Sequence, residues 1–402
     1  MKLSCLLVVV ACLLSVASAD SLNCRFVGSC PTPGNAVDVF VNGTHAYVAC
    51  ETAGLRTISV SDPANPTEVG FCDTPGSAQG VAVSGNYAYV ADGSAGFRVV
   101  AIADPAHPAE VGHCDLPDWA WDVVVAESYA YVADHTGGLR IISTADPANP
   151  TEVGYCNTHI VYGVAVAGSY AYVANGDSGF RVISVSDPAN PTEVGYCGTP
   201  SRAEGVAVKG NYAYVADLAA GLRVISVSDP ANPVEVGSCE TPGNAEGVTV
   251  VEDYAYVADV GAGLRVISVA NPASPVEVGY YSTPRSACEL AVAGDYVYVA
   301  HGDAGLRIHQ FYGEVGVEEG RQPPRCGSQP PAAIVHGILF LPSAPTVEPG
   351  ASGVLLDAAG RRVLNLRAGA NDVSCLAPGL YFIRGAQAQA QAQAVRRVVI
   401  TR

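Results

Sequence analysis

Acidic, basic and aromatic side chains recur at one place in this sequence, just before or at the start of short apolar segments. The members of this set are Trp119, Trp121, Asp122, His159, Tyr162, Arg202, Glu204, Glu246, Arg285 and Glu289. Tryptophan and tyrosine rings stack on sugars or anchor protein partners. Paired carboxylates hydrolyse glycosides. The set therefore predicts either a binding site or a hydrolytic site.

The hydrolytic alternative has no local motif in the sequence. The carboxylates of the set, which Asp38 joins, lie in separate repeats, so no sequence spacing determines how far apart they are. No Gly-x-Ser-x-Gly nucleophile motif occurs, and His135, His159 and His301 lack metal-ligand spacing. We predict a protein that is not an enzyme and needs no cofactor. Ca²⁺ beside the carboxylates is the metal alternative, and a glycoside or ester hydrolase is the catalytic one.

A hexapeptide repeat shows which elements must position these residues. Tyr-Ala-Tyr-Val-Ala-Asp stands at 87–92, 129–134, 212–217 and 254–259, with variants at 45–50, 170–175 and 296–301. The spacing is 42 residues five times and 41 once. A fixed period of this length indicates a repeat protein in which each copy is one supersecondary unit. Function is therefore expected where the copies differ.

One unit, residues 79–114, shows the expected local structure. Apolar segments at 80–83, 87–91, 97–103 and 109–114 alternate with turn residues, including a proline loop at 104–108. Turns at intervals of about 8–12 residues between β-branched and aromatic segments indicate short antiparallel strands. Several segments are apolar at nearly every position, so both faces need cover. Four strands in about 42 residues predict a β-propeller blade, with a parallel β-helix as the alternative.

The two ends of the repeat region predict how the ring closes. The seventh unit has expected strands at 289–293, 296–300 and 305–311 but no fourth strand after them. Near the N-terminus, Phe26-Val-Gly-Ser-Cys30 matches the fourth-strand segment Glu193-Val-Gly-Tyr-Cys197. We predict that this N-terminal strand completes the last blade. The fold would then be an all-β, seven-bladed propeller with no open sheet edge.

The repeating unit Gly-Leu-Arg-Val-Ile-Ser-Val-Ser-Asp-Pro-Ala-Asn-Pro, present with variations across residues 24–312, resembles the LVIVD-repeat family of exported prokaryotic propellers. The resemblance implies a propeller in the cell envelope or on the cell surface. It implies no reaction and transfers no catalytic residue to this chain.

Rows of identical charged residues are predicted to belong to the scaffold. Arginine holds one position in all seven units, at 56, 98, 140, 181, 223, 265 and 307. The end of the preceding strand holds Asp92, Asp134, Asn175, Asp217 and Asp259. Both rows flank one hairpin turn, where ion pairing or turn capping explains them. Glutamates at 68, 110, 152, 193, 235 and 277 are expected to be a solvated outer row.

Cysteines at 30, 72, 114, 156, 197 and 239 share one position in successive units. Equivalent residues on stacked sheets lie at least about 10 Å apart, whereas a disulfide needs Cα atoms within about 7 Å. We therefore predict small buried residues rather than disulfides. Cys24 and Cys288 fall outside this position and are a candidate pair. The states of Cys50, Cys326 and Cys375 stay open.

The N-terminus and the composition indicate export. Lys2, an apolar run and Ala17-Ser18-Ala19 predict a signal peptide at 1–19, with lipoprotein processing at Cys12 as the alternative. No other long apolar run occurs, so no membrane span is expected. The net charge of −17 argues against nucleic-acid partners and anionic membranes, because both require clustered cations.

The C-terminal part has a different composition. Residues 313–333 are typical of a linker, and 334–402 form an expected small β domain. The turn at 357–362, the segment Ala-Pro-Gly-Leu-Tyr-Phe and the basic final strand resemble the C-terminal sorting domain of type IX secretion substrates, an immunoglobulin-like sandwich. The resemblance implies a cargo label that the type IX machinery recognises and commonly removes. A permanent structural domain is the alternative.

Together these features predict an exported monomer on the surface of a bacterium of Gram-negative type. Its variable face would bind a surface glycan or a protein partner, with Trp119 and Trp121 as anchors. A propeller hydrolase and a purely structural envelope component are the two alternatives.

Overall fold

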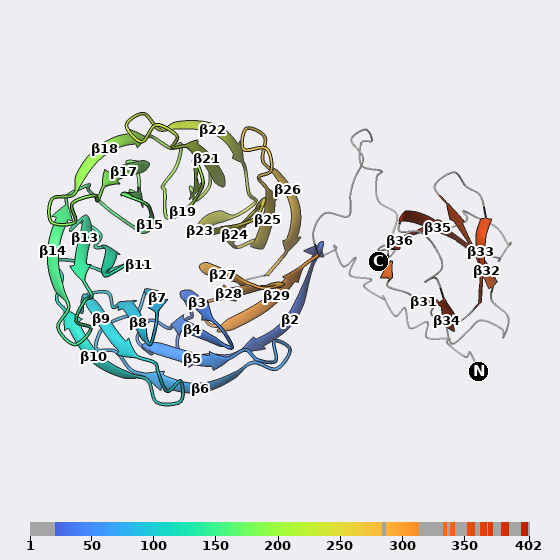
Figure 1. Ribbon diagram of the computed structural model, residues 1–402, viewed down its shortest axis with the longest axis horizontal. Coiled ribbons are helices and arrows are strands. Elements are labelled where there is room, and N and C mark those ends of the chain that lie inside the picture. The colour runs from blue at the N-terminus through green and yellow to red at the C-terminus, as the bar shows by residue number, and fades with distance from the viewer. Residues whose placement is uncertain are drawn as a thin grey trace, which may run out of the picture. The chain divides into compact units, whose positions relative to one another are not determined.

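The computed structural model describes residues 21–283 and 287–312 and, in the C-terminal part, the strands between 333 and 400. The chain divides into two compact units, Met1–Val317 and Glu318–Arg402. In the first unit, seven sheets surround one central axis (Figure 1). The predicted seven-bladed β-propeller with four-stranded blades is confirmed. The described part of the chain holds no helix long and apolar enough to cross a membrane.

Each blade is an antiparallel meander whose first strand lies nearest the axis. The first strands are β3 (Asp38–Asn42), β7 (Gly80–Ser84), β11 (Asp122–Ala126), β15 (Gly163–Ala167), β19 (Gly205–Lys209), β23 (Asn244–Val251) and β27 (Glu289–Ala293). The second strands are β4 (His45–Ala49), β8 (Tyr87–Ala91), β12 (Tyr129–Ala133), β16 (Tyr170–Ala174), β20 (Tyr212–Ala216), β24 (Tyr254–Val260) and β28 (Tyr296–Ala300).

The outer half of each blade holds the third and fourth strands. The third strands are β5 (Leu55–Ser59), β9 (Phe97–Ala101), β13 (Leu139–Ser143), β17 (Phe180–Ser184), β21 (Leu222–Ser226), β25 (Gly263–Ser268) and β29 (Leu306–Phe311). The fourth strands are β6 (Thr67–Cys72), β10 (Ala109–Cys114), β14 (Thr151–Cys156), β18 (Thr192–Cys197), β22 (Val234–Cys239), β26 (Val276–Tyr281) and β2 (Cys24–Cys30). We number the blades 1 to 7 from β3–β6 onward.

The hydrophobic core lies between the blades. In a second strand such as β8, Ala88, Tyr89, Val90 and Ala91 are all buried although their side chains alternate between two faces. One face packs on the preceding blade and the other on the following blade, because successive residues of a strand point to opposite sides. The fourth strands face solvent on one side and are largely exposed. Burial therefore decreases from the second strand to the fourth. This explains why the Tyr-Ala-Tyr-Val-Ala segment of the second strand is the most constant part of the repeat.

Blade 7 is completed by the N-terminal strand, as predicted. β2 pairs antiparallel with β29, and its register places Cys24 opposite Phe311 and Cys30 opposite Leu306. The short strand β1 (Ser21–Leu22) adds a fifth strand to the outer edge of blade 6 through Tyr280 and Tyr281. The ring is therefore closed by backbone hydrogen bonds between the two ends of the repeat region.

Neighbouring blades approach most closely at a β-bulge glycine in the fourth strand. A Cβ atom added to Gly154 would lie 2.2 Å from the Pro188 carbonyl oxygen in the Asp-Pro loop of the next blade. The equivalent glycines of the other blades, except Gly279, meet the matching proline carbonyl in the same way: Gly28, Gly70, Gly112, Gly195 and Gly237. At these six interfaces the proline loop packs against the preceding blade so closely that only glycine fits at the contact.

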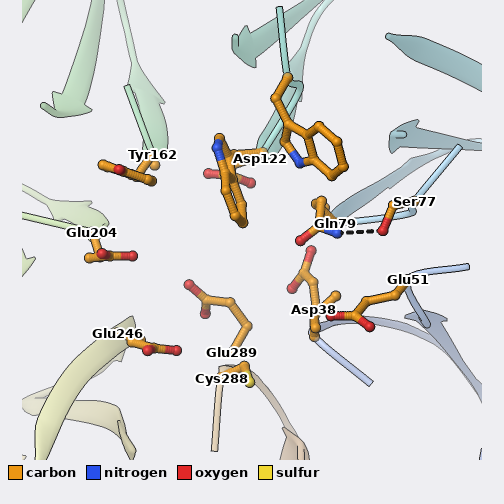
Figure 2. Close-up of a pocket in the computed structure, with 15 residues that line it drawn as sticks. Asp38, Glu51, Ser77, Gln79, Asp122, Tyr162, Glu204, Glu246, Cys288 and Glu289 are labelled. Atoms are coloured by element: carbon orange, nitrogen blue, oxygen red, sulfur yellow. Dashed lines mark hydrogen bonds between the residues drawn. The ribbon is translucent and has the colours of Figure 1, made fainter. Parts of the chain in front are cut away.

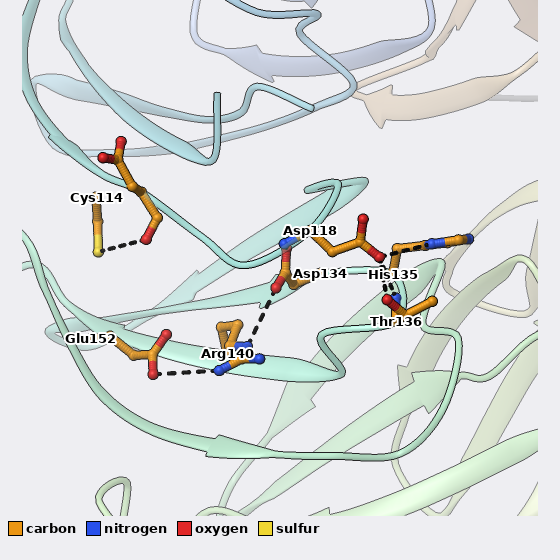
Figure 3. A network of polar contacts seen from close by, with 8 residues as sticks. Cys114, Asp118, Asp134, His135, Thr136, Arg140 and Glu152 are labelled. Carbon is orange, nitrogen blue, oxygen red and sulfur yellow. Dashed lines mark hydrogen bonds and ion pairs between the residues drawn. The ribbon is translucent and has the colours of Figure 1, made fainter. Parts of the chain in front are cut away.

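The arginine row is structural, as predicted. In blade 3, Arg140 Nε lies 3.3 Å from Asp134 Oδ2 and Arg140 Nη1 lies 3.5 Å from Glu152 Oε1 (Figure 3). The guanidinium also stacks on Tyr155 at 4.8 Å. The glutamate row corrects our expectation, because it is not merely solvated. Six arginines reach the glutamate of the neighbouring fourth strand at 3.0–3.6 Å, which links the strands of each blade.

The cysteine row contains thiols and no disulfide within the described residues. Cys30 and Cys72 are buried as expected, whereas Cys114, Cys156, Cys197 and Cys239 are only half-buried. The candidate pair is wrong, since Cys24 and Cys288 are not joined. Cys24 instead packs in the core between blades 6 and 7. Cys326 and Cys375 lie outside the described residues.

The second unit contains strands that form one five-stranded sheet, in the order β30-β36-β35-β32-β33, and one two-stranded sheet of β31 and β34. Their bounds are β30 (Ala333–Val335), β31 (Ile338–Leu341), β32 (Ser352–Asp357), β33 (Arg362–Arg367), β34 (Gly369–Asp372), β35 (Gly379–Gly385) and β36 (Val395–Ile400). The predicted signal peptide, most of the linker and the Gln-Ala segment at 386–394 lie outside the described residues.

Candidate functional site

A cavity of about 420 Å³ opens where the first strands begin, at the mouth of the central channel (Figure 2). Its lining residues are Val37, Asp38, Glu51, Ser77, Gln79, Gly80, Trp119, Trp121, Asp122, Tyr162, Gly163, Glu204, Glu246, Cys288 and Glu289. They come from all seven blades, and this face carries the loops before the first strand and after the second strand.

Two adjacent positions of the repeat supply most of this wall. The inner position, at or near the start of the first strand, holds Asp38, Gly80, Asp122, Gly163, Gly205, Gly247 and Glu289. The position before it holds Val37, Gln79, Trp121, Tyr162, Glu204, Glu246 and Cys288. Glycine is required at the inner position of some blades, because a Cβ atom on Gly163 would lie 2.4 Å from the Glu204 carbonyl oxygen. The wall therefore alternates side chains with bare backbone.

Backbone bridges between blades hold the mouth in shape. The second residue after the second strand pairs with the residue two positions before the inner position of the next blade, as in Glu51 with Ala78 and His135 with Val161. The Glu51 and Ala78 N–H groups each donate to the other's carbonyl oxygen at 3.0 Å, and the Val161 N–H donates to the His135 carbonyl oxygen at 3.1 Å. Glu51 and His135 adopt left-handed backbone conformations, with φ of 46° and 40°. Such conformations cost energy in non-glycine residues and gather at functional sites.

Asp38 and Asp122 are anchored by backbone donors. The N–H groups of Val39 and Val81 donate to the two oxygens of Asp38, both at 2.6 Å. Val123 and Val164 donate to Asp122 in the same way, at 2.6 and 2.9 Å. Each carboxylate therefore ties its own blade to the next one.

Burial perturbs the ionisation of both anchored carboxylates. Burial and the nearby charge of Asp122 raise the pKa of Asp38 to about 7. Burial raises the pKa of Asp122 to about 6, and its two backbone hydrogen bonds oppose the shift. Burial disfavours a charged carboxylate, and a second negative charge nearby disfavours it further.

Glu204 has a cationic partner at the rim. Arg202 Nε donates to Glu204 Oε1 at 2.6 Å, and Arg202 Nη2 contacts the same oxygen. The Arg202 guanidinium lies over the Tyr162 ring at 4.5 Å from its centroid. Burial raises the pKa of Glu204, and the Arg202 charge opposes the shift.

Glu246 and Glu289 are neighbours on blades 6 and 7. A Cβ atom on Gly247 would lie 2.4 Å from Glu289 Oε2, so the Glu289 carboxylate lies directly over the residue that follows Glu246. Figure 2 shows both carboxylates directed into the cavity. Burial and the charge of Glu204 raise the pKa of Glu246 to about 7. Burial and the charges of Asp38 and Asp122 raise the pKa of Glu289 well above its usual range.

Aromatic rings form the opposite side of the wall. The ring centroid of Trp121 lies 6.3 Å from that of Trp119, 5.7 Å from Tyr162 and 6.4 Å from His135. Both tryptophans are half-buried. Their Nε1 atoms are buried and have no hydrogen-bond partner. The indoles therefore present carbon atoms, not N–H groups, to the cavity.

The loop that carries Trp119 is fixed by Asp118 (Figure 3). Asp118 accepts hydrogen bonds from the Thr136 backbone N–H at 3.0 Å and from the Thr136 hydroxyl. The same carboxylate oxygen lies 3.2 Å from His135 Nδ1. The aromatic side of the cavity is thus held by polar contacts between the two loops of blade 3.

A comparison with protein families identifies the repeat that builds the blades. LVIVD repeats are matched at residues 33–74, 75–116, 119–158, 160–199, 200–241, 242–283 and 284–308. The chain belongs to the LVIVD-repeat family. A comparison of this LVIVD-repeat chain with curated proteins finds no match.

Solved structures share the fold of this LVIVD-repeat protein at low sequence identity. The WD40 beta propeller domain of Doa1 matches with a TM-score of 0.59 at 10% identity, covering 72% of this chain and 97% of that chain. A chain of the Mitotic Checkpoint Complex matches with a TM-score of 0.60 at 12% identity, covering 72% and 94%. The computationally designed Ika8 protein matches with a TM-score of 0.54 at 8% identity, covering 71% and 99%. These similarities show the fold alone.

Most residues of the predicted set line the cavity of this LVIVD-repeat protein: Trp119, Trp121, Asp122, Tyr162, Glu204, Glu246 and Glu289. Arg202 stands behind Glu204. His159 is exposed outside the lining, with φ of 62°. Arg285 lies outside the described residues.

Eight lining residues were not in the predicted set, although Asp38 was considered with its carboxylates: Val37, Asp38, Glu51, Ser77, Gln79, Gly80, Gly163 and Cys288. Val37 and Cys288 occupy the same repeat position as Trp121, so the repeat register alone was sufficient to find them. Glu51 and Ser77 lie in the loops that the interblade bridge joins, and no sequence signal marks that bridge. Within residues 21–283 and 287–312, no group of three His, Cys, Asp or Glu side chains is arranged to hold a metal ion.

Proposed function

We propose that this LVIVD-repeat protein is a non-catalytic binding module that takes a ligand into the cavity at the channel mouth. One observation carries the proposal: the residues that differ most between repeats converge on this cavity, whereas the identical rows stabilise the scaffold. A volume of about 420 Å³ lies within the range of small-ligand sites. In many folds, varied loops on a rigid frame bind the ligand.

A rigid frame reduces the entropy that binding costs. The mouth is held by interblade bridges, by the anchored Asp38 and Asp122 carboxylates, and by the contacts of Asp118. These contacts hold the cavity wall in place. Trp119 and Trp121 are the largest apolar side chains in its wall, and we assign them as the anchors for a glycan or a protein side chain.

The proposal includes export to the cell surface. It is supported by the signal-like residues 1–19, by the resemblance of 334–402 to type IX sorting domains, and by membership of the LVIVD-repeat family. The partner would then be a surface glycan or an envelope protein, and the propeller would bind it as a monomer.

Tryptophan fluorescence tests the binding site directly, because the chain contains two tryptophans and both line the cavity. A panel of neutral sugars, amino sugars and envelope-protein fragments is titrated into the full chain. We expect at least one compound to change the emission, and Trp119→Ala to weaken its binding roughly 30-fold, as loss of an aromatic anchor does.

The matched control is Tyr196→Ala, which removes a 65% exposed aromatic ring from an outer strand. It should bind as the unmodified chain does. Thermal unfolding must show that Trp119→Ala is folded. Equal binding by Trp119→Ala, measured by calorimetry, would refute the anchor assignment.

The second candidate is a hydrolase of glycosides or esters. The pKa values of about 7 for Asp38 and Glu246 favour it, because an acid–base group works best when its pKa is near the working pH. If turnover of a chromogenic glycoside or ester is detected, Glu204→Gln and Glu246→Gln should abolish it. Turnover that survives both amide substitutions would exclude Glu204 and Glu246 as the catalysts.

A further inference from the structure

We call blades 5–7 of the cavity wall the acidic half and blades 3 and 4 the aromatic half; Asp122 also lies in the aromatic half, and Asp38 and Glu51 line the cavity from blade 1. Glu204, Glu246 and Glu289 stand on blades 5, 6 and 7, while Trp119, Trp121 and Tyr162 stand on blades 3 and 4 (Figure 2). The two halves face each other across the opening. A ligand that fills the cavity therefore touches carboxylate oxygens on one side and aromatic carbon on the other.

The negative charge in the acidic half is only partly balanced by Arg202, which also acts on Glu246 beyond ion-pair distance. Glu204 is paired with Arg202, whereas no arginine, lysine or histidine in the described part of the chain pairs with Glu246 or Glu289. The Leu290 N–H donates to Glu289 at 3.1 Å. Backbone N–H groups donate hydrogen bonds to Asp38 and Asp122. The described residues donate no such bond to Glu246. Like charges held together in a buried wall repel each other.

The aromatic half carries a cost of its own. The buried Nε1 atoms of Trp119 and Trp121 lack hydrogen-bond partners, and an unsatisfied buried donor destabilises a fold. Because their N–H groups make no hydrogen bond, the two indoles can contact a ligand only through their ring carbons. The face of an indole attracts cations.

We propose, on the basis of the proposed binding function, that the ligand of this cavity carries a protonated organic amine. The ammonium group contacts Glu246 and Glu289, and the carbon skeleton beside it lies on Trp119 and Trp121. An ammonium group would favour the ionised carboxylates, whereas a neutral sugar would gain no such charge interaction and an anion would be repelled. A bare metal ion is disfavoured, because no three acidic, histidine or cysteine groups of residues 21–283 and 287–312 converge to hold one.

The test uses pairs of probes that differ in charge but little in shape. Cadaverine, a linear diamine, is compared with pentanediol, and glucosamine is compared with glucose. Each is titrated into the full chain at low ionic strength and about pH 7, where both amines are largely protonated, with tryptophan fluorescence and calorimetry as readouts. We expect each amine to bind about tenfold or more tightly than its neutral partner. The amine that binds more tightly shows whether the ligand is a linear amine or an amino sugar.

Variants locate the contact. Glu246→Gln should weaken amine binding about tenfold, whereas Glu240→Gln, which changes the net charge equally at an exposed site, should not. Glu246→Gln removes an unpaired buried charge, so we expect it to fold. If it does not, the comparison of charged and neutral probes on the unmodified chain still decides.

Amine and alcohol binding with equal affinity would overturn the proposal, and so would the absence of amine binding in both readouts. A neutral sugar that binds through Trp119 while amines do not would refute the amine but retain the binding module.

Discussion

At the scale of single residues, the cavity carboxylates differ from ordinary surface acids. Asp38 and Glu246 have pKa values of about 7 and Asp122 of about 6, whereas the same groups in an unfolded chain titrate near 4. The folded protein therefore binds protons that the unfolded chain has released. The charged groups around them are Glu204, Glu289 and Arg202, with Glu51 and Cys288 also in the wall.

This difference predicts how stability depends on pH. A group with a raised pKa in the folded state contributes stability below about pH 4, and the contribution is lost as the pH rises through about 7. We expect the midpoint of thermal unfolding to fall by several degrees between about pH 5 and pH 8. Asp134, whose burial raises its pKa to about 6, acts in the same direction.

Glu246→Gln isolates the contribution of the cavity, because an amide does not titrate in this range. Its thermal midpoint should fall less over the same pH interval at constant ionic strength. A midpoint that rises with pH in the unmodified chain, or an identical fall in the variant, would contradict the assignment of strained carboxylates to this wall.

At the scale of elements, β2 has a different task from the other fourth strands. The other blades take four consecutive strands from the chain, whereas blade 7 joins β27–β29 to a strand from the N-terminus. Without β2, the backbone donors and acceptors of β29 would form an open edge, which favours aggregation. The closing strand also carries Cys24 and Cys30 into the core clusters on either side of blade 7.

A chain that begins at Pro31 tests this role. We expect its thermal midpoint to fall by roughly 10 °C, because several kcal/mol of pairing and burial are lost, and we expect it to aggregate more readily. Removal of residues 318–402, which form a separate unit, is the control and should leave the transition of the propeller in place. A Pro31 start with an unchanged midpoint would show that the ring does not depend on the N-terminal strand.

At the scale of the whole molecule, the repeat region is a scaffold that places one varied cavity at its centre. The bulge glycines, proline loops and arginine–glutamate pairs recur around the ring, so the geometry of the mouth is set by closure and not by any one blade. The proposed signal peptide and sorting domain would deliver this unit and then be removed.

Processing can be read from the mature protein. We expect mass spectrometry of surface-exposed protein from the native host to find an N-terminus at Asp20 and no peptides from 334–402. Peptides that extend to Arg402 on surface protein would show that the C-terminal unit is permanent. A lipid-modified N-terminal Cys12 would favour the lipoprotein alternative.

The sequence by itself determined the strands, the count of seven blades and the closure by Phe26–Cys30, because periodicity, turn residues and a missing fourth strand are local signals. It also placed Trp121, Glu204 and Glu246 at one repeat position. Only the tertiary structure decided that they share a cavity with Asp38 and Glu289. Residues 42 positions apart in sequence meet only because the ring closes at a given radius. The interblade bridge that brings in Glu51 and Ser77, and the burial that raises the carboxylate pKa values, likewise arise from contacts between blades.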